Sequence, residues 1–190
     1  MNFAAAILAG GQSRRMGQDK ARLFVGGQSL LARQIALARS LAASEIFISG
    51  RAGDTYSEFA LPVLYDRFAD AGPLGGIEQA LAGTAEPMLL VLAVDMPHVT
   101  KDLLTRLRTR CAAGLGVVPC LGGQAEPLVA LYPKSAHTLA EKLIAEGSYA
   151  VREFAERCEK AGLAKFYDVG VADAHCFSNW NTPEDIPLSD

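Results

Sequence analysis

The sequence lacks several features that would reveal its class at once. Its four cysteines (Cys111, Cys120, Cys158 and Cys176) are far apart with no C-x-x-C pair, which argues against a disulfide framework or a zinc site. The formal net charge is −3, so no global positive field attracts nucleic acid or an anionic membrane. No apolar run reaches the roughly 20 residues of a membrane span. We therefore expect a cytoplasmic protein with reduced thiols that binds neither nucleic acid nor membrane.

Histidine is also scarce, and the first residues resemble no export signal. His98, His137 and His175 stand apart from any serine or cysteine nucleophile motif, so we expect no catalytic histidine. The start of the chain has no basic segment, so we expect no signal peptide. What remains is a chain of 190 residues, 50% hydrophobic and 21% charged, which is an ordinary globular composition. That length suits one domain with a large core.

The most informative stretch is an apolar run near the start that ends at two glycines. Residues 3–8 predict a buried first strand. Glycines such as Gly10 and Gly11 allow positive φ and let a ligand approach bare main-chain amides. Four cations and a single acid then follow, namely Arg14, Arg15, Lys20 and Arg22 around Asp19. This combination predicts a site for a polyphosphate or nucleotide, with a glycine turn and a solvated basic face as the alternative.

Two widespread phosphate-binding loops do not fit this stretch. A Walker A loop has four residues between its glycines and then Gly-Lys-Ser/Thr, whereas five residues separate Gly11 from Gly17 here. Gln18 and Asp19 also stand directly before the lysine. The dinucleotide fingerprint Gly-x-Gly-x-x-Gly is absent as well. If this loop binds a nucleotide, it is neither a Walker A loop nor a dinucleotide-binding loop.

The same stretch closely resembles the signature of the molybdenum cofactor guanylyltransferases, Leu-Ala-Gly-Gly-x-Ser-x-Arg-Met-Gly-x-Asp-Lys-x-x-Leu. Every fixed position is met, by Leu8, Ala9, Gly10, Gly11, Ser13, Arg15, Met16, Gly17, Asp19, Lys20 and Leu23. The resemblance implies that residues 8–11 and Lys20 bind GTP, that molybdopterin is the second substrate, and that Mg²⁺ is the cofactor. From their place after the glycines, we expect Arg15 and Lys20 to neutralise the triphosphate in catalysis.

Strand and helix patterns alternate along the rest of the chain. Strands are expected at residues 45–49, 62–65, 88–94, 115–120, 128–132 and 163–169, and helices at 30–43, 73–83, 101–113, 135–146 and 148–162. Ser29, Thr100, Ser135 and Ser148 are the expected N-caps. This order predicts an α/β fold with a mostly parallel central sheet and helices on both faces. With the family resemblance, it predicts a single Rossmann-like nucleotidyltransferase domain over residues 1–190.

Several polar residues follow the predicted strands, where ligands bind in parallel sheets. Asp95 comes after the most apolar run of the chain, so we expect it to bind Mg²⁺ rather than only cap a turn. The Asp-x-Pro segment of the family carries the metal-binding aspartate, in agreement with this expectation. Ser49, the last residue of the second strand, and Asp66, just after the third, are expected to contact the nucleotide. For Asp66, a plain turn carboxylate is an equal alternative.

Three later segments extend the resemblance to nearly the whole chain. Residues 71–76 resemble the family's second nucleotide-binding segment and start a helix, whose N-terminus attracts phosphate. Residues 126–132 resemble a stretch near the second substrate, although an ordinary strand remains the alternative. Asn179 and Asn181 match the family's terminus, would share one face of a strand, and could support metal or substrate; turn chemistry is the alternative. The GTP site would then lie in residues 1–100, and the C-terminal part would contribute to the pterin site.

The sequence thus predicts transfer of GMP from GTP to molybdopterin with release of pyrophosphate. A cytidylyltransferase for the same pterin and a sugar-phosphate nucleotidyltransferase are the alternatives within this class. Pterin enzymes that use CTP tend to have Leu-Ala-Ala-Gly where this chain has Leu8-Ala9-Gly10-Gly11. A non-catalytic nucleotide- or cofactor-binding protein is the alternative of another class. Other proteins of molybdenum cofactor biosynthesis and apo-molybdoenzymes are the protein partners that the resemblance implies.

Overall fold

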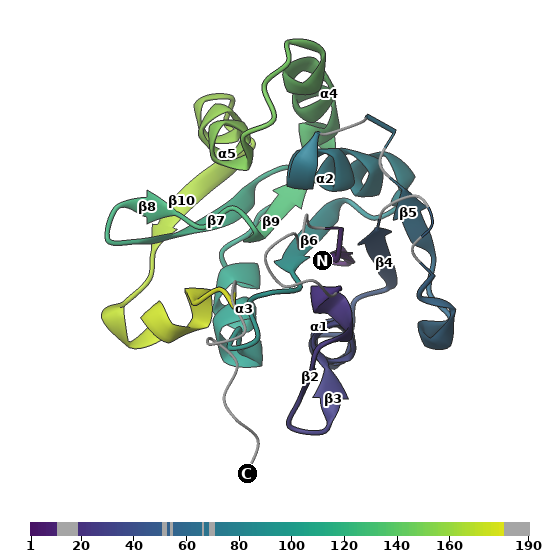
Figure 1. Ribbon diagram of the computed structural model, residues 1–190. Helices are drawn as coiled ribbons and strands as arrows, with labels where there is room; N and C mark the ends of the chain where they lie inside the picture. Colours follow the sequence, from purple (N-terminus) through teal and green to yellow (C-terminus); the bar gives the residue numbers. More distant parts are fainter. Residues whose placement is uncertain (11–18, 51–52, 54, 66, 69–70, 181–190) are drawn as a thin grey trace.

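The core of the protein is an eight-stranded, mostly parallel sheet (Figure 1). The computed structural model describes residues 1–10, 19–50, 53, 55–65, 67–68 and 71–180. The main strands follow the order β10-β7-β9-β6-β1-β4-β5, and β8 pairs with β7. Their bounds are Ala4–Leu8 (β1), Glu45–Gly50 (β4), Val63–Tyr65 (β5), Met88–Ala93 (β6), Gly116–Leu121 (β7), Gln124–Ala125 (β8), Val129–Pro133 (β9) and Ala164–Asp168 (β10). Among the described strands of this sheet, only β8 and β9 run against the others.

Helices cover both faces of this sheet, as the sequence predicts. Helices α1 (Leu30–Ser40) and α3 (Lys101–Arg108) lie on one face. Helices α2 (Gly72–Gly83), α4 (His137–Ala145) and α5 (Val151–Lys160) lie on the other, at the top of Figure 1. Strand β1 shows why both faces need covering: successive side chains of a strand point to opposite faces, and those of β1 are apolar. Ala5 and Ile7 pack with α1 and α3, whereas Ala4, Ala6 and Leu8 pack with α2 and its neighbours.

Two of the four expected helix caps are confirmed. The Ser29 hydroxyl accepts the Ala32 N–H at 3.1 Å, and the Thr100 hydroxyl accepts the Leu103 N–H at 3.2 Å. Each bond satisfies an amide that has no partner inside its helix. The backbone of residues 30 and 101 therefore enters the helix where the sequence indicates.

The other two caps were predicted wrongly, and four helices (α1, α3, α4 and α5) are shorter than expected. A 3-10 turn at Lys134–Ala136 precedes α4, which has no side-chain cap. The Ser148 hydroxyl donates to the Glu153 carboxylate instead of capping a helix at its own position. Helix α1 ends at Ser40, before a left-handed residue, and α3 ends at Arg108. Serine propensity alone thus does not locate these starts.

The chain also contains a small hairpin and four free thiols. Strands β2 (Phe24–Val25) and β3 (Gln28–Ser29) pair through Gly26 and Gly27, whose φ angles are +58° and +82°. Such angles explain the glycines, because side chains disfavour this region. The four cysteines are free, in agreement with the expected absence of a disulfide framework. Within the described residues, every helix is too short or too polar to cross a membrane.

The last described residues of the chain lie beside Asp95, just beyond the carboxyl end of β6. Residues Val171–Phe177 form a 3-10 helix, and residues 178–180 are not part of a strand. The expected strand at Asn179 is therefore wrong, and Asn181 lies outside the described residues. Trp180 is buried, and its backbone N–H donates to the Asp95 carbonyl oxygen at 2.9 Å. The tail thus supports the backbone of Asp95, while the Asn179 side chain is exposed.

Candidate active site

A cavity of about 240 Å³ lies where β1, β4 and β6 reach their carboxyl ends. Its lining comprises Leu8, Ala9, Gly10, Lys20, Ser49, Gly72, Pro73, Ala93, Val94, Asp95 and Leu128. Six of these residues were expected individually in the nucleotide site, namely Leu8, Ala9, Gly10, Lys20, Ser49 and Asp95, and Gly72 and Pro73 belong to the expected second nucleotide-binding segment. The remaining expected residues, Gly11, Arg15 and Asp66, lie outside the described residues. The structure therefore brings together the described part of the predicted site.

The two sides of the cavity are joined by backbone hydrogen bonds just beyond the strands. The Ser49 carbonyl oxygen accepts the N–H groups of Ala9 at 2.9 Å and Gly10 at 3.0 Å. The Leu8 carbonyl oxygen accepts the Val94 N–H at 3.2 Å on the opposite side. The expectation of bare amides is thus wrong for Ala9 and Gly10, because β4 already uses both donors. A phosphate in this cavity has to be bound by other groups.

Helix α2 points its N-terminus at the cavity and lies unusually close to β4. Gly72 has a φ of +58°, and Pro73 occupies the first turn, where an amide would lack a helical partner. A Cβ on Gly76 would lie 2.2 Å from the Ser49 hydroxyl, so only glycine permits this approach. The aligned peptide dipoles of a helix favour an anion at this end. The cavity therefore offers an electrically favourable wall for phosphate.

Lys20 and Asp95, both expected to be catalytic, meet across the cavity. Lys20 Nζ lies 3.3 Å from Asp95 Oδ2, although 75 residues separate them in the chain. Their side chains are 14% and 25% exposed, which leaves a polar face for a ligand while much of each group is shielded. Partial burial of opposite charges favours their pairing, since neither is then buried alone. This pair is the chemical centre of the described cavity.

Sequence reasoning missed one buried contact that holds the Asp95 loop. The Gln34 side chain of α1 donates from Nε2 to the Met96 carbonyl oxygen at 2.8 Å, and Gln34 is only 1% exposed. A glutamine on the apolar face of a helix, beside Leu31 and Ile35, is the signal that could have revealed it. Together with the backbone N–H of Trp180, which donates to the Asp95 carbonyl oxygen, this bond anchors two consecutive carbonyl groups of the loop.

Residues 126–132, expected from the sequence to lie near the second substrate, reach the cavity at Leu128. Leu128 lines the cavity, and its carbonyl oxygen accepts the Ala93 N–H at 2.9 Å. Glu126 lies two residues earlier and donates its N–H to the Pro119 carbonyl oxygen at 2.8 Å. Burial raises the pKa of the Glu126 carboxyl, and Arg152 opposes this shift. The C-terminal half thus contributes Leu128 to the lining, and the half-buried Glu126 precedes it by two residues.

A second polar cluster joins α2 to α4 and does not include Asp95. Within the described residues, Glu78, His137 and Glu141 are the group of three whose ligand atoms lie close enough to hold a metal. The fully buried Glu78 carboxylate already contacts Arg67 and, at 2.9 Å, His137 Nε2. His137 Nδ1 lies 3.5 Å from Glu141. We interpret this cluster as an ion-pair network between two helices.

Most of the chain matches a known protein family. Residues 5–161 match the model described as the MobA-like NTP transferase domain. The chain belongs to the MobA-like NTP transferase family. This membership confirms the family resemblance and the nucleotidyltransferase class that the sequence predicts.

Two relatives in the MobA-like family cover nearly the whole chain. A probable molybdenum cofactor guanylyltransferase of Opitutus terrae is 36% identical over 186 residues, which are 96% of this chain and 92% of the relative. The molybdenum cofactor guanylyltransferase of Rhizobium meliloti is 35% identical over 96% of this chain and 88% of its own length. The similarity therefore extends well beyond the glycine-rich start.

Solved structures show the same fold in MobA-like and related proteins. Molybdopterin-guanine dinucleotide biosynthesis protein A of Archaeoglobus fulgidus has a TM-score of 0.75 at 24% identity, over 96% of this chain and 94% of that one. A methylerythritol phosphate cytidylyltransferase of Thermus thermophilus has a TM-score of 0.68 at 16% identity, over 95% and 93%. The Rossmann-like α/β fold is thus confirmed. Since a cytidylyltransferase shares it, the fold itself does not select the nucleotide.

Proposed function

We propose that this protein transfers GMP from GTP to molybdopterin in the cytoplasm, with release of pyrophosphate. The observation that carries the proposal is the meeting of Lys20 and Asp95 in a cavity walled by the signature residues Leu8, Ala9 and Gly10. The names of the relatives support the choice of substrates. The nucleotide would occupy the edge formed by residues 1–100, and the C-terminal part would receive the pterin.

The proposed reaction makes modest demands on the side chains. A phosphate oxygen of molybdopterin attacks the α-phosphorus of GTP, and the bond to the pyrophosphate oxygen breaks. No general base is needed, because the second pKa of a phosphate monoester is about 6 and the attacking group is already ionised at neutral pH. Lys20, Arg15 and the N-terminus of α2 would balance the negative charge of the triphosphate. Catalysis would then consist of positioning and charge neutralisation.

Asp95 is the residue that we expect to hold Mg²⁺. Its carboxylate lines the cavity at the end of a central strand and is 25% exposed, so it can offer oxygen to a hard cation. When bound, Mg²⁺ would neutralise charge on the reacting phosphates. Lys20 Nζ lies 3.3 Å from Asp95 Oδ2, so its ammonium would lie beside the phosphates of a nucleotide bound in this cavity. Arg15, Asp66 and Asn181 stay predictions, as does support from Asn179.

Guanine would be selected by main-chain groups of the cavity wall. Ala9 and Gly10 donate their N–H groups to Ser49, so in this proposal carbonyl oxygens of the wall would accept the N–H donors of guanine. Adenine and cytosine present a different pattern and would leave such groups unpaired. Each unpaired buried polar group costs about 1–3 kcal/mol, which is enough for strong discrimination.

One assay separates the proposed function from its alternatives. The protein is incubated with Mg²⁺, molybdopterin and each nucleoside triphosphate in turn, and pyrophosphate is measured, with Lys20→Ala as the matched control. Among the nucleoside triphosphates, we expect only GTP to release pyrophosphate in the presence of molybdopterin. Release only with CTP would identify a cytidylyltransferase. Release only when a sugar phosphate replaces the pterin would identify a sugar-phosphate nucleotidyltransferase. Binding of GTP without any release would identify a non-catalytic carrier. Apo-molybdoenzymes and other biosynthesis proteins remain the proposed protein partners.

A further inference from the structure

The turn that carries Lys20 is held by a hydrogen-bonded aspartate. Asp19 is the N-cap of a 3-10 turn at Lys20–Arg22, and its Oδ1 accepts the Ala21 N–H at 3.0 Å. Its other oxygen, Oδ2, accepts the hydroxyl of Tyr56 at 3.1 Å. One carboxylate thus fixes the local backbone and links it to a distant segment. The second link connects the turn to Tyr56, which lies 37 residues further along the chain.

The same distant segment also holds the far end of the turn. The Arg22 guanidinium donates to the Thr55 carbonyl oxygen and lies 3.2 Å from the Glu58 carboxylate. It also lies 5.7 Å above the centre of the Tyr56 ring. Asp19 and Arg22, on either side of Lys20, are therefore both bound to residues 55–58. We call these contacts the Tyr56 clamp.

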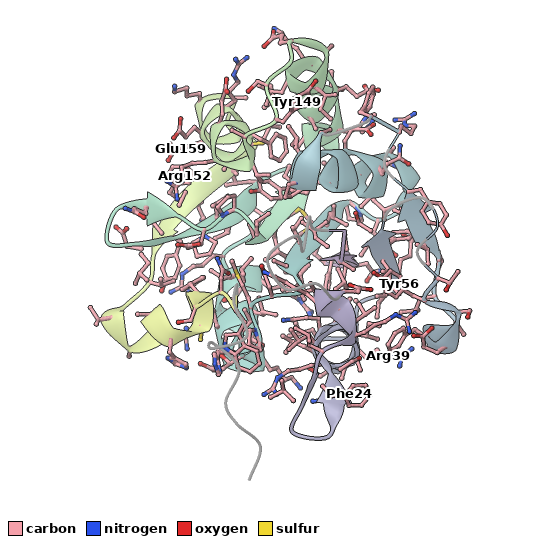
Figure 2. All side chains as sticks on the ribbon, viewed as in Figure 1. Phe24, Arg39, Tyr56, Tyr149, Arg152 and Glu159 are labelled. Carbon is pink, nitrogen blue, oxygen red and sulfur yellow. The ribbon has the colours of Figure 1, made fainter. Side chains whose placement is uncertain are left out.

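The exposure of the side chains indicates which contact of the Tyr56 clamp is stronger, the Arg22–Glu58 ion pair or the Tyr56–Asp19 hydrogen bond. The Arg22 and Glu58 side chains are 52% and 46% exposed, so water and salt weaken their pairing. Tyr56 is 1% exposed and packs in the core cluster with α1. Its hydroxyl donates to a charged acceptor, which makes a stronger bond than one between neutral groups. The buried tyrosine is therefore the rigid side of the clamp; Figure 2 labels its position.

We propose that Tyr56 is a positioning residue for nucleotidyl transfer. Its hydroxyl holds Asp19, Asp19 holds the turn, and the turn aims Lys20 Nζ at the cavity beside Asp95. The inference rests on the proposed function, in which Lys20 neutralises the triphosphate. Small displacements of such a group are costly, since an error of about 1 Å can slow an enzyme a hundredfold. Losing one of several supports should slow the reaction less, about tenfold.

The test is a cycle of three variants, measured as kcat for pyrophosphate release at saturating GTP, Mg²⁺ and molybdopterin. We expect a loss of about tenfold for Tyr56→Phe and about a hundredfold for Lys20→Ala. The double variant should match Lys20→Ala, because Tyr56 acts only through the lysine. Tyr149→Phe, on an exposed tyrosine labelled near the top of Figure 2, is the matched control and should keep the wild-type rate. Multiplied losses in the double variant, or a full rate for Tyr56→Phe, would overturn the proposal.

A second readout keeps the clamp testable apart from the reaction. Acylation of lysines, followed by mass spectrometry, should label Lys20 several-fold faster in Tyr56→Phe than in the wild type, with the exposed Lys101 unchanged as the internal control. Should Tyr56→Phe not fold, Asp19→Ser keeps a capping oxygen and removes the oxygen that Tyr56 binds. Unchanged labelling of Lys20 in the folded variant refutes the clamp. If labelling rises but the wild type transfers no nucleotide, the proposed function fails and the role in transfer fails with it.

Discussion

Gly76→Ala should destabilise the protein through the contact between α2 and β4. The added Cβ would lie 2.2 Å from the Ser49 hydroxyl oxygen, 3.0 Å from the Ser49 Cβ and 3.2 Å from a Leu8 methyl group. Ser49 is buried on a central strand, so its Cβ has little freedom to move away. The helix and strand therefore have to separate, or the serine has to leave its rotamer.

The expected loss combines two opposing effects. Overpacking a well-filled site costs about 1–3 kcal/mol, and the close approach here places the cost near the upper end. Alanine is favoured over glycine inside a helix by about 1 kcal/mol, which offsets part of it. A net loss of about 2 kcal/mol should lower the Tm by about 4–8 °C in a protein of this size. GTP affinity should fall as well, because Leu8 and Ser49 line the cavity.

Urea unfolding and GTP titration measure both effects. Gly83→Ala is the matched control on the same helix, since a Cβ there meets nothing within 4 Å. Its stability should be unchanged or raised by up to about 1 kcal/mol. Adding Ser49→Ala to Gly76→Ala removes the closest contact and should restore part of the stability. If Gly76→Ala is as stable as the wild type, α2 and β4 do not touch as described.

Four further results are expected. Lys20→Ala should slow pyrophosphate release about a hundredfold, because a well-placed cation stabilises a transition state by about 3 kcal/mol; a near-normal rate would remove it from the mechanism. Asp95→Asn should fold normally, require more Mg²⁺ and turn over at least about a hundredfold more slowly, whereas a wild-type Mg²⁺ titration would place the metal elsewhere. Burial raises the pKa of Cys158 to about 12, so iodoacetamide should label this thiol only after unfolding, and rapid labelling of the native protein would contradict its burial. Burial also raises the pKa of the Glu126 carboxyl in the folded protein, so the free energy of unfolding in urea should fall as the pH rises from 4.5 through that pKa. Glu126→Gln should remove this part of the pH dependence. An identical pH profile for the variant and the wild type would refute the prediction.

The sheet and the place of the cavity could be predicted because they depend on local patterns. Apolar runs such as residues 88–94 predict buried strands, and the carboxyl ends of parallel strands share an edge. This geometry is why Ser49 and Asp95, each at a strand end, line one cavity. The direction of β9 could not be predicted in this way, since an apolar run reads the same for either direction.

The contacts that hold the site in place were beyond sequence reasoning for a different reason. The bond between Tyr56 and Asp19 spans 37 residues and depends on how residues 55–59 fold back, for which no motif exists. The use of the Ala9 and Gly10 amides by Ser49 likewise depends on how β1 and β4 are aligned. Serine propensity failed at Ser135 and Ser148, because local preference is weak where tertiary packing sets the helix start.

The pairing of β9 with β6 has a consequence for the stability of the nucleotide-binding half on its own. Strand β6 is the most apolar strand of the chain, and β9 pairs with the edge of β6 that faces away from β1. A fragment that ends near residue 100 would retain the strands of the GTP side but leave this edge open. Open, apolar edges readily pair with other chains and lead to aggregation. We therefore expect the first hundred residues to be insoluble when produced alone, and to be rescued only when the segment carrying β9 is supplied.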